Sequence, residues 1–260
     1  MMVHMAIDIE DMPRGGPDAS WLDRRLETDR LEYLDRDDVD GKKRAVVRSL
    51  DLLGRVFGLH ERFARTAFQE VRGVPNAKIL ELGSGHGGLS RRLLEMDPTA
   101  HVTVTDVEPS SVAAIAAGDL GSHPRAVVRE MDATAIDAPD GSYDLAVFAL
   151  SFHHLPPALA SRAFAEGTRV AARLVIIDLP RPPAPLHILR LSQMLPLAMI
   201  PVVHDGVISS LRAYSSSALV ALARHANPTI RVELRGGGLF DSPMRPRPQV
   251  AVASRLRGAR

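Results

Sequence analysis

The spacing of apolar residues changes near residue 77 and divides the chain into a helical first part and a mixed second part. In the first part, apolar residues recur at helical spacing within a charged segment, 21–40, and again within 42–71. The stripe in the second segment consists of Val46, Val47, Leu50, Leu53 and Phe57. This segment is one helix or a pair of helices broken near Gly54 and Gly58. We therefore expect residues 21–72 to form an N-terminal helical cap.

From residue 77 onward, short apolar runs alternate with helical segments. The expected strands span 77–82, 102–105, 125–129, 143–150, 174–178, 229–234 and 249–254, and the expected helices span 88–96, 110–117, 157–171 and 216–225. Alternation at this interval indicates an α/β fold, a parallel sheet with helices on both faces. The last two strands have no helix between them, which predicts an antiparallel edge.

Residues 180–213 interrupt the alternation. A proline-rich stretch, RPPAP, leads into the apolar run 186–203, and HDG follows. Plain core packing is one interpretation, and a lid or a pocket wall for a hydrophobic ligand is the other. We expect the lid. Because the run carries Arg190, Gln193, Pro196 and Pro201, we do not expect it to span a membrane.

Composition adds three expectations. The chain has no cysteine, which excludes cysteine zinc sites and thiol nucleophiles and suits a reducing cytoplasm. A formal net charge of +1 gives no reason to expect a nucleic-acid partner. Residues 1–20 lack the order of a signal peptide and hold Pro13, Gly15, Gly16 and Pro17, so we expect them to lack fixed structure.

The segment ILELGSGHGG, residues 79–88, is the strongest signal for function. A buried strand runs into Gly83, Gly85 and Gly87, and a helix follows. Glycines at such a turn let a nucleotide-like ligand approach the backbone closely. Gly83, Gly85 and Gly88 also satisfy G-x-G-x-x-G, the dinucleotide fingerprint, and a tight turn without a ligand stays open as well.

Acidic residues at three successive strand ends favour a ligand site. Glu81 precedes the glycines, Asp106 closes the second strand, and Asp132 follows the third. Asp106 is placed to accept hydrogen bonds from two ribose hydroxyls. Each acid alone reads equally well as a solvated loop residue, but ligands of open parallel sheets bind at this carboxyl edge. The predicted cofactor-binding residues are Glu81, Gly83, Ser84, Gly85, Gly87, Asp106, Val107, Asp132 and Ala133.

Residues 77–155 resemble the core of class I S-adenosylmethionine (SAM)-dependent methyltransferases. ELGSGHG is similar to that family's first motif, Asp106 in VTDVEP to its ribose-binding acid, and MDATAIDAPDGSYDLAVFALSFHHL to its next two motifs. The resemblance implies a Rossmann-like seven-stranded sheet with an antiparallel last strand over 73–260. It also implies SAM as cofactor and S-adenosylhomocysteine (SAH) as product, with Glu81 facing the amino group of SAM. The quinone-biosynthesis type is most similar, and LEYLDRDDVD and DLPRPP…HDGVISSLRAYS resemble methyltransferases associated with type III polyketide synthases.

The histidines are the candidate catalytic residues. His153 and His154 follow the fourth strand, and His204 lies in the 180–213 insertion beside Asp205. We expect His154 to act as a base or to orient the acceptor, although any of the three fits a structural role equally well. Tyr33 and Arg212 are further candidates for lining the site. We expect no metal site, since no acidic cluster is visible in the sequence.

The predicted function is O- or C-methylation of a small apolar or aromatic acceptor, polyketide- or quinone-like. Alternatives are an NAD(P)-dependent oxidoreductase and a SAM-binding protein without catalytic activity. A nucleic-acid methyltransferase is disfavoured, because the place of its Asn/Asp-Pro-Pro-aromatic motif reads ALSF. The sequence leaves the oligomeric state open, with a homodimer among the options.

Overall fold

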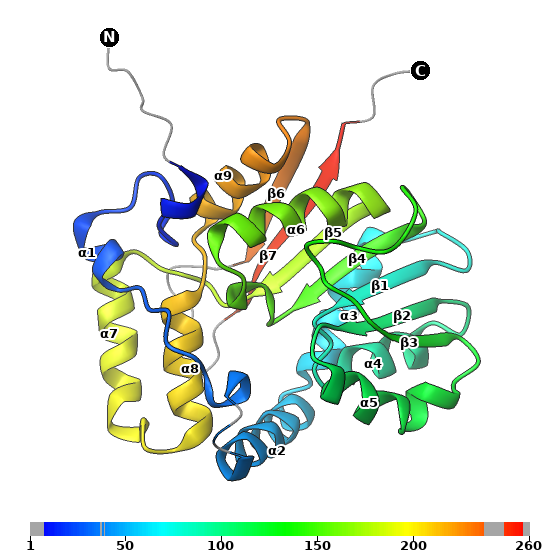
Figure 1. Cartoon of the computed structure of the whole chain (residues 1–260), viewed down its shortest axis with the longest axis horizontal. Coiled ribbons are helices and arrows are strands. Elements are labelled where there is room, and N and C mark those ends of the chain that lie inside the picture. Colours follow the sequence, from blue (N-terminus) through cyan, green and yellow to red (C-terminus); the bar gives the residue numbers. More distant parts are fainter. Residues whose placement is uncertain (1–7, 37, 39, 237–246, 257–260) are drawn as a thin grey trace.

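The computed structural model describes residues 8–36, 38, 40–236 and 247–256. Within these residues, seven strands form one sheet in the order β3-β2-β1-β4-β5-β7-β6 (Figure 1). The strands are β1 (Lys78–Leu82), β2 (His101–Asp106), β3 (Ala126–Glu130), β4 (Tyr143–Ala149), β5 (Ala171–Asp178), β6 (Ile230–Gly236) and β7 (Gln249–Arg255). β7 runs antiparallel to both of its neighbours, whereas the pairs among β1 to β5 are parallel. The predicted mostly parallel sheet with an antiparallel last strand is confirmed.

Helices cover both faces of the sheet. On one face lie α3 (Leu59–Glu70), α4 (Gly88–Met96) and α5 (Pro109–Ala116), and on the other lie α6 (Pro157–Val170) and α9 (Ser216–Ala226) (Figure 1). Along β1, Ile79 belongs to the core of the first face, while Leu80 and Leu82 belong to the core of the second. A strand buried on both faces needs an unbroken apolar run, which is why these strands were readable from the sequence.

Gly58 separates the two helices predicted within 42–71. α2 (Asp40–Val56) ends before it and α3 begins after it, because Gly58 adopts a left-handed φ of +58°. α2 packs on α8, and α3 packs on α4 and β4. The predicted pair is therefore present, with α3 forming part of the layer over the sheet.

The segment 21–40 differs from the helical expectation. α1 (Trp21–Arg25) is short, and among the described residues between it and α2 the one further helical element is η2 (Tyr33–Asp35), a single 3-10 turn. The residues at helical spacing, Leu22, Leu26, Tyr33 and Leu34, are each only partly buried, and Leu22 and Leu26 lie on α1 or directly after it, whereas Tyr33 and Leu34 lie on η2. Instead, Glu32 and Asp35 accept hydrogen bonds from Ser209 and Arg212, far along the chain, and these bonds hold the segment in an irregular path.

Residues 8–20 also differ from the expectation that 1–20 lack fixed structure. η1 (Ile9–Asp11) is a 3-10 turn, and Met12 and Arg14 are both 5% exposed. The Arg14 guanidinium donates a 2.8 Å hydrogen bond to the carbonyl of His153. Burial of a paired cation fixes this stretch despite its prolines and glycines. Residues 1–7 lie outside the described residues.

The 180–213 insertion is a helical hairpin. α7 (Ala184–Met194) passes through the short turn η5 (Leu195–Leu197) into α8 (Pro201–Arg212), and the two helices lie side by side (Figure 1). Ala184, Leu191 and Ile208 are buried at the base of the hairpin, whereas Met199 at its tip is 94% exposed. Across the described residues, no helix has the length and apolar character needed to cross a membrane.

Candidate active site

The loop between β1 and α4 is built on three glycines with left-handed backbone. Gly83, Gly85 and Gly87 have φ values of +66°, +56° and +76°, where any side chain would be strained. A Cβ on Gly83 would lie 2.8 Å from the Ser151 Oγ, so this glycine permits close contact with the end of β4. A Cβ on Gly85 would meet nothing within 4 Å. The loop thus leaves open space beside its middle glycine.

Asp106, at the end of β2, fixes the conformation of this loop. Its Oδ2 accepts a 2.8 Å hydrogen bond from the Gly85 amide, and its Oδ1 accepts a 3.0 Å bond from the Glu108 amide. Ser84 lies between the glycines, and its Oγ is buried without a hydrogen-bond partner among the described residues. An unpaired buried hydroxyl beside a carboxylate with free lone pairs suits a polar ligand.

Glu81 lies under the loop rather than on its surface. It shares the face of β1 that Ile79 occupies, is 2% exposed, and accepts a hydrogen bond from the Ser90 hydroxyl of α4. Burial raises the pKa of the Glu81 carboxyl to about 7, and the hydrogen bond from Ser90 offsets only part of that rise. A carboxyl with this pKa gains or loses a proton readily near neutrality when a charged group approaches.

The other predicted cofactor-binding residues lie on the loops after β2 and β3. Val107 is 64% exposed directly after Asp106, and Ala133 is partly buried against the core. The exposed Asp132 accepts two 2.8 Å hydrogen bonds, from the amide and the hydroxyl of Thr134, and so holds its own loop. All three lie at the same edge of the sheet as the glycines, and their roles in binding stay predictions.

His153 and His154 lie in η4 (Phe152–His154), the turn that follows β4. The His153 side chain is 4% exposed, and its Nδ1 lies 2.7 Å from Oδ1 of Asp178 at the end of β5. Burial works to lower the pKa of His153, but the charge and hydrogen bond of Asp178, aided by Glu32, overcome it and raise this pKa to about 9. The adjacent carboxylate fixes the ring of His153.

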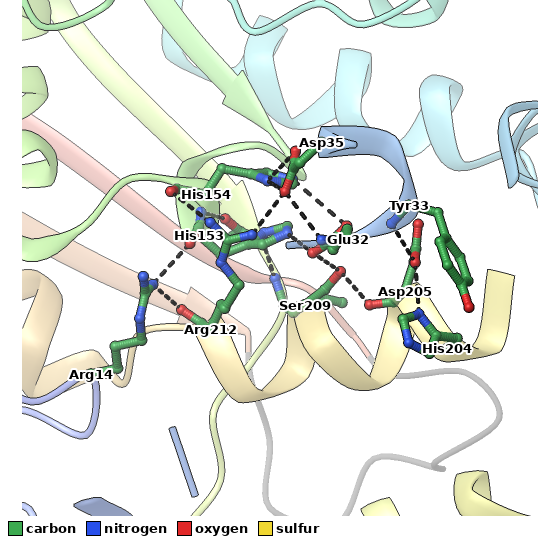
Figure 2. A network of polar contacts seen from close by, with 12 residues as sticks. Arg14, Glu32, Tyr33, Asp35, His153, His154, His204, Asp205, Ser209 and Arg212 are labelled. Carbon is green, nitrogen blue, oxygen red and sulfur yellow. Dashed lines mark hydrogen bonds and ion pairs between the residues drawn. The ribbon is translucent and has the colours of Figure 1, made fainter. Parts of the chain in front are cut away.

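Glu32 and Asp35, from the segment before α2, close over the two histidines (Figure 2). Glu32 Oε1 lies 3.5 Å from Nε2 of His153, and its Oε2 lies 3.9 Å from Nε2 of His154. Asp35 Oδ1 lies 3.2 Å from Nδ1 of His154. Burial works to raise the pKa of Asp35, but hydrogen bonds from His154 and Arg212 lower it to about 2. We name Glu32, His153 and His154 the histidine–glutamate cluster.

Helix α8 supports this cluster from the hairpin side. Ser209 Oγ donates a 2.7 Å hydrogen bond to Glu32 Oε1. Arg212 donates to Oδ2 of Asp35 at 2.9 Å and to the carbonyl of His154 at 3.0 Å (Figure 2). Arg212 is therefore part of the site, although it contacts the carboxylate behind His154 rather than the cluster itself.

His204 has different partners. Its ring stacks on Tyr33 with centroids 4.3 Å apart, and its Nδ1 lies 3.0 Å from Asp205 Oδ1. The same Asp205 oxygen accepts a 2.9 Å hydrogen bond from the Tyr33 amide. The structure thus brings His153 and His154 together and places His204 one step away, on the other side of Glu32 (Figure 2).

Sequence reasoning missed Glu32, Asp35 and Asp178 as site residues. Asp178 carried a usable signal, since it ends a buried strand at the same edge of the sheet as Asp106. Glu32 and Asp35 lie within LEYLDRDDVD, whose resemblance to other methyltransferases assigned them no role. Their position at the site depends on the irregular path of residues 26–36, which local propensity does not predict.

Comparison with known proteins agrees with this architecture. Residues 79–173 match a family described as a methyltransferase domain. The chain is 37% identical over 112 residues to a malonyl-[acyl-carrier protein] O-methyltransferase of Geobacter sulfurreducens, covering 43% of this chain and 40% of that one. It is 34% identical over 140 residues to a demethylmenaquinone methyltransferase of Thermus thermophilus, covering 51% of this chain and 62% of that one. The chain thus spans less than two thirds of the length of either relative.

Solved structures show the same fold. A plantazolicin methyltransferase crystallised in complex with SAH superposes with a TM-score of 0.59 at 13% identity, covering 84% of this chain and 91% of that chain. A second solved structure, that of the pyocyanin biosynthetic protein PhzM, superposes with a TM-score of 0.58 at 18% identity, covering 86% of this chain and 61% of that chain. We conclude that residues 79–173 of this chain match a methyltransferase domain, within a fold that these solved structures share.

Proposed function

We propose that this protein is a SAM-dependent methyltransferase that methylates a small apolar or aromatic acceptor and releases SAH. One juxtaposition carries the proposal. The glycine loop and the two histidines of the histidine–glutamate cluster follow the adjacent parallel strands β1 and β4, and Ser151, just before the histidines, donates a 3.3 Å hydrogen bond to the Leu82 carbonyl just before Gly83. A cofactor in the loop and an acceptor at the cluster would therefore meet at one edge of the sheet.

The loop residues fit SAM. The open space at Gly85 admits the ligand, and the unpaired Ser84 hydroxyl offers it a hydrogen bond. Asp106 would accept from the ribose hydroxyls, Glu81 would face the amino group, and Val107, Asp132 and Ala133 would lie along the adenine. When bound, SAM supplies an electrophilic methyl group on a sulfonium sulfur.

The cluster handles the acceptor. Direct methyl transfer requires an acceptor held in line in a dry site and, for a hydroxyl or carbon acid, removal of a proton. His154 is the more accessible histidine, with 27% of its side chain exposed against 4% for His153. Its Nδ1 is held by Asp35, which leaves Nε2 on the side of Glu32. His154 is therefore the residue that meets the acceptor, with His153 behind it.

Apolar side chains near the cluster support an apolar acceptor. α2 packs against α8, and α8 packs against the turn that carries the histidines. Exposed apolar residues lie on α2, directly after it, and at the tip of the α7–α8 hairpin, namely Leu50, Leu53, Phe57, Leu195, Leu197, Met199 and Ile200. In this account the hairpin, residues 180–213, is a lid over the acceptor.

In this proposal the protein acts on a small molecule rather than on a nucleic acid, and the protein is located in the cytoplasm. The near-neutral net charge supports the first statement, and the lack of cysteine is compatible with the second.

A screen for methyl transfer tests the proposal. The protein is incubated with SAM and a panel of phenols, quinols and polyketide-type acids, and products are searched by mass spectrometry for a gain of one methyl group. His101→Gln serves as the active control, since His101 is exposed at the opposite end of β2. SAM binding without any methylated product would favour a binding protein without catalysis. A retained cofactor with the near-ultraviolet absorption of reduced nicotinamide would favour the oxidoreductase.

A further inference from the structure

We propose that Glu32, His153 and His154 form a binding site for a divalent transition-metal ion of the Zn²⁺ class. One oxygen or nitrogen from each residue can be chosen so that all three lie within 4.8 Å of one another. Two imidazoles and one carboxylate are a ligand set typical of zinc and related ions. The sequence analysis expected no metal site, because no acidic cluster is visible in the sequence, and Glu32 is distant in the chain from the two histidines.

The spacing of the ligand atoms fits an ion better than a hydrogen bond. Zinc–ligand bonds of about 2.0–2.2 Å in a tetrahedral arrangement place neighbouring ligand atoms about 3.3–3.6 Å apart. Glu32 Oε1 lies 3.5 Å from His153 Nε2, within this range, and Glu32 Oε2 lies 3.9 Å from His154 Nε2, slightly beyond it. A direct N–H···O hydrogen bond would draw these atoms to about 2.7–3.2 Å.

The Nε2 atom of His153 points to the same conclusion independently. It is buried and has no hydrogen-bond partner among the described residues, although a carboxylate faces it. In native proteins the large majority of buried side-chain nitrogens have a hydrogen-bond partner, so a buried nitrogen without one needs an explanation. An ion between Nε2 and Glu32 supplies the missing partner.

Both histidines are supported as metal ligands usually are. The Nδ1 of His153 is held by Asp178 at 2.7 Å, and the Nδ1 of His154 by Asp35 at 3.2 Å. A carboxylate on the outer nitrogen fixes the tautomer that leaves Nε2 free to bind metal. Ser209 holds the third ligand through its 2.7 Å hydrogen bond to Glu32.

Three protein ligands leave a coordination position for an exchangeable molecule. The role of the ion, unlike its binding, rests on the proposed function. An acceptor hydroxyl bound there would have its pKa lowered and would release its proton to water, with His154 holding the ion instead of taking the proton itself, so the methyl group would be transferred to an oxyanion.

Metal binding is tested on untagged, full-length protein stripped with a chelator. Calorimetric titration with Zn²⁺ should show one tight site per chain. The Co²⁺-loaded protein should show the visible absorption of Co²⁺ in a low-symmetry site. Glu32→Gln and His153→Gln should abolish both signals, while Asp35→Asn and Asp178→Asn should weaken binding about 10- to 100-fold. His101→Gln should bind like the wild type.

Two measurements keep folding and function separate from this test. Because Glu32 and His153 are buried, each variant is also checked for a cooperative melting transition and for SAM binding. Zn²⁺ should raise the melting temperature of the wild type but not of Glu32→Gln. The metal site would be overturned if the wild type did not bind Zn²⁺. It would also be overturned if the folded Glu32→Gln and His153→Gln variants still bound Zn²⁺. Failure to bind SAM would instead count against the proposed function.

Discussion

The carboxylate of Glu32 lies 3.5 Å from the imidazole of His153, so the segment that precedes α2 completes a site whose other part follows β4. Glu32 is 2% exposed and also accepts a hydrogen bond from Ser209 of the hairpin. Three separate parts of the chain therefore meet at this carboxylate. Among the described residues, the carboxylate of Glu32 contacts the histidines and α8, and not the glycine loop. A mutation of Glu32 should therefore affect the acceptor site without affecting the cofactor site.

Glu32→Gln should lower methyl transfer strongly while leaving SAM affinity within about twofold of the wild-type value. The reason is that Glu32 contacts the histidines and α8, whereas the predicted cofactor contacts come from β1, β2 and β3. Calorimetry with SAM and a turnover assay on the same preparation measure the two effects. A parallel loss of SAM affinity in a folded variant would show that the two sides are coupled.

His154→Ala should reduce turnover about 10²- to 10⁴-fold, the range expected when a group that handles a proton is lost. The comparison is made against His204→Ala, whose side chain stacks on Tyr33 and should give a smaller loss. Turnover is recorded across a range of pH. Unchanged turnover at every pH would assign His154 a structural role.

Glu81→Gln should remove a pH dependence of stability. The pKa of Glu81 is raised from its ordinary 4.5 to about 7 in the folded chain, chiefly by burial. The protonated form is therefore favoured by folding, and its stabilisation is present below about pH 4.5 and lost as the pH rises through about 7. The full change is on the order of 3 kcal/mol. Denaturant unfolding at pH 4.5, 6 and 8 should show that the free energy of unfolding falls more with rising pH in the wild type than in the variant. The same pH dependence in both proteins would contradict this.

Residues 180–213 should behave as a lid in hydrogen exchange. The exposed tip of the hairpin, with Met199 at 94% exposure, should exchange quickly in the free protein and slow down when SAM and acceptor are both bound. The buried base, with Ala184 and Ile208, should change little. Protection by lipid vesicles would indicate membrane docking, and protection at high protein concentration alone would indicate a dimer interface. Strong protection of 186–203 in the free monomer would mean plain core.

The centre of the sheet was predictable because β1, β4, β5 and β7 are buried on both faces. β1 (KILEL) and β4 (YDLAVFA) are rich in apolar residues, and their observed ends lie within one residue of the expected ones. The segment 21–40 was misread because the apolar spacing around Leu22 and Leu26 looked helical, while tertiary hydrogen bonds of Glu32 decide its path. Propensity cannot anticipate a contact between residues so far apart in the chain.

The site was only half predictable for the same reason. Gly85 and Asp106 could be placed together because parallel strands end at one edge, and their 2.8 Å hydrogen bond agrees with that expectation. His153 and His154 were singled out by their position after β4, but their partners Glu32 and Asp35 arrive from an irregular segment. Only the folded chain shows that the histidines face carboxylates.

Calorimetric titration of the wild-type protein with SAM and SAH tests the central claim most directly. The account predicts saturable binding of both, and a loss of about 1–3 kcal/mol, or about 5- to 150-fold in affinity, in Asp106→Asn. Asp137→Asn is the matched control, because the Asp137 side chain is 92% exposed in a surface ion pair with Arg129. Melting curves verify that each variant is folded. Absence of SAM and SAH binding to the folded wild-type protein would contradict the account.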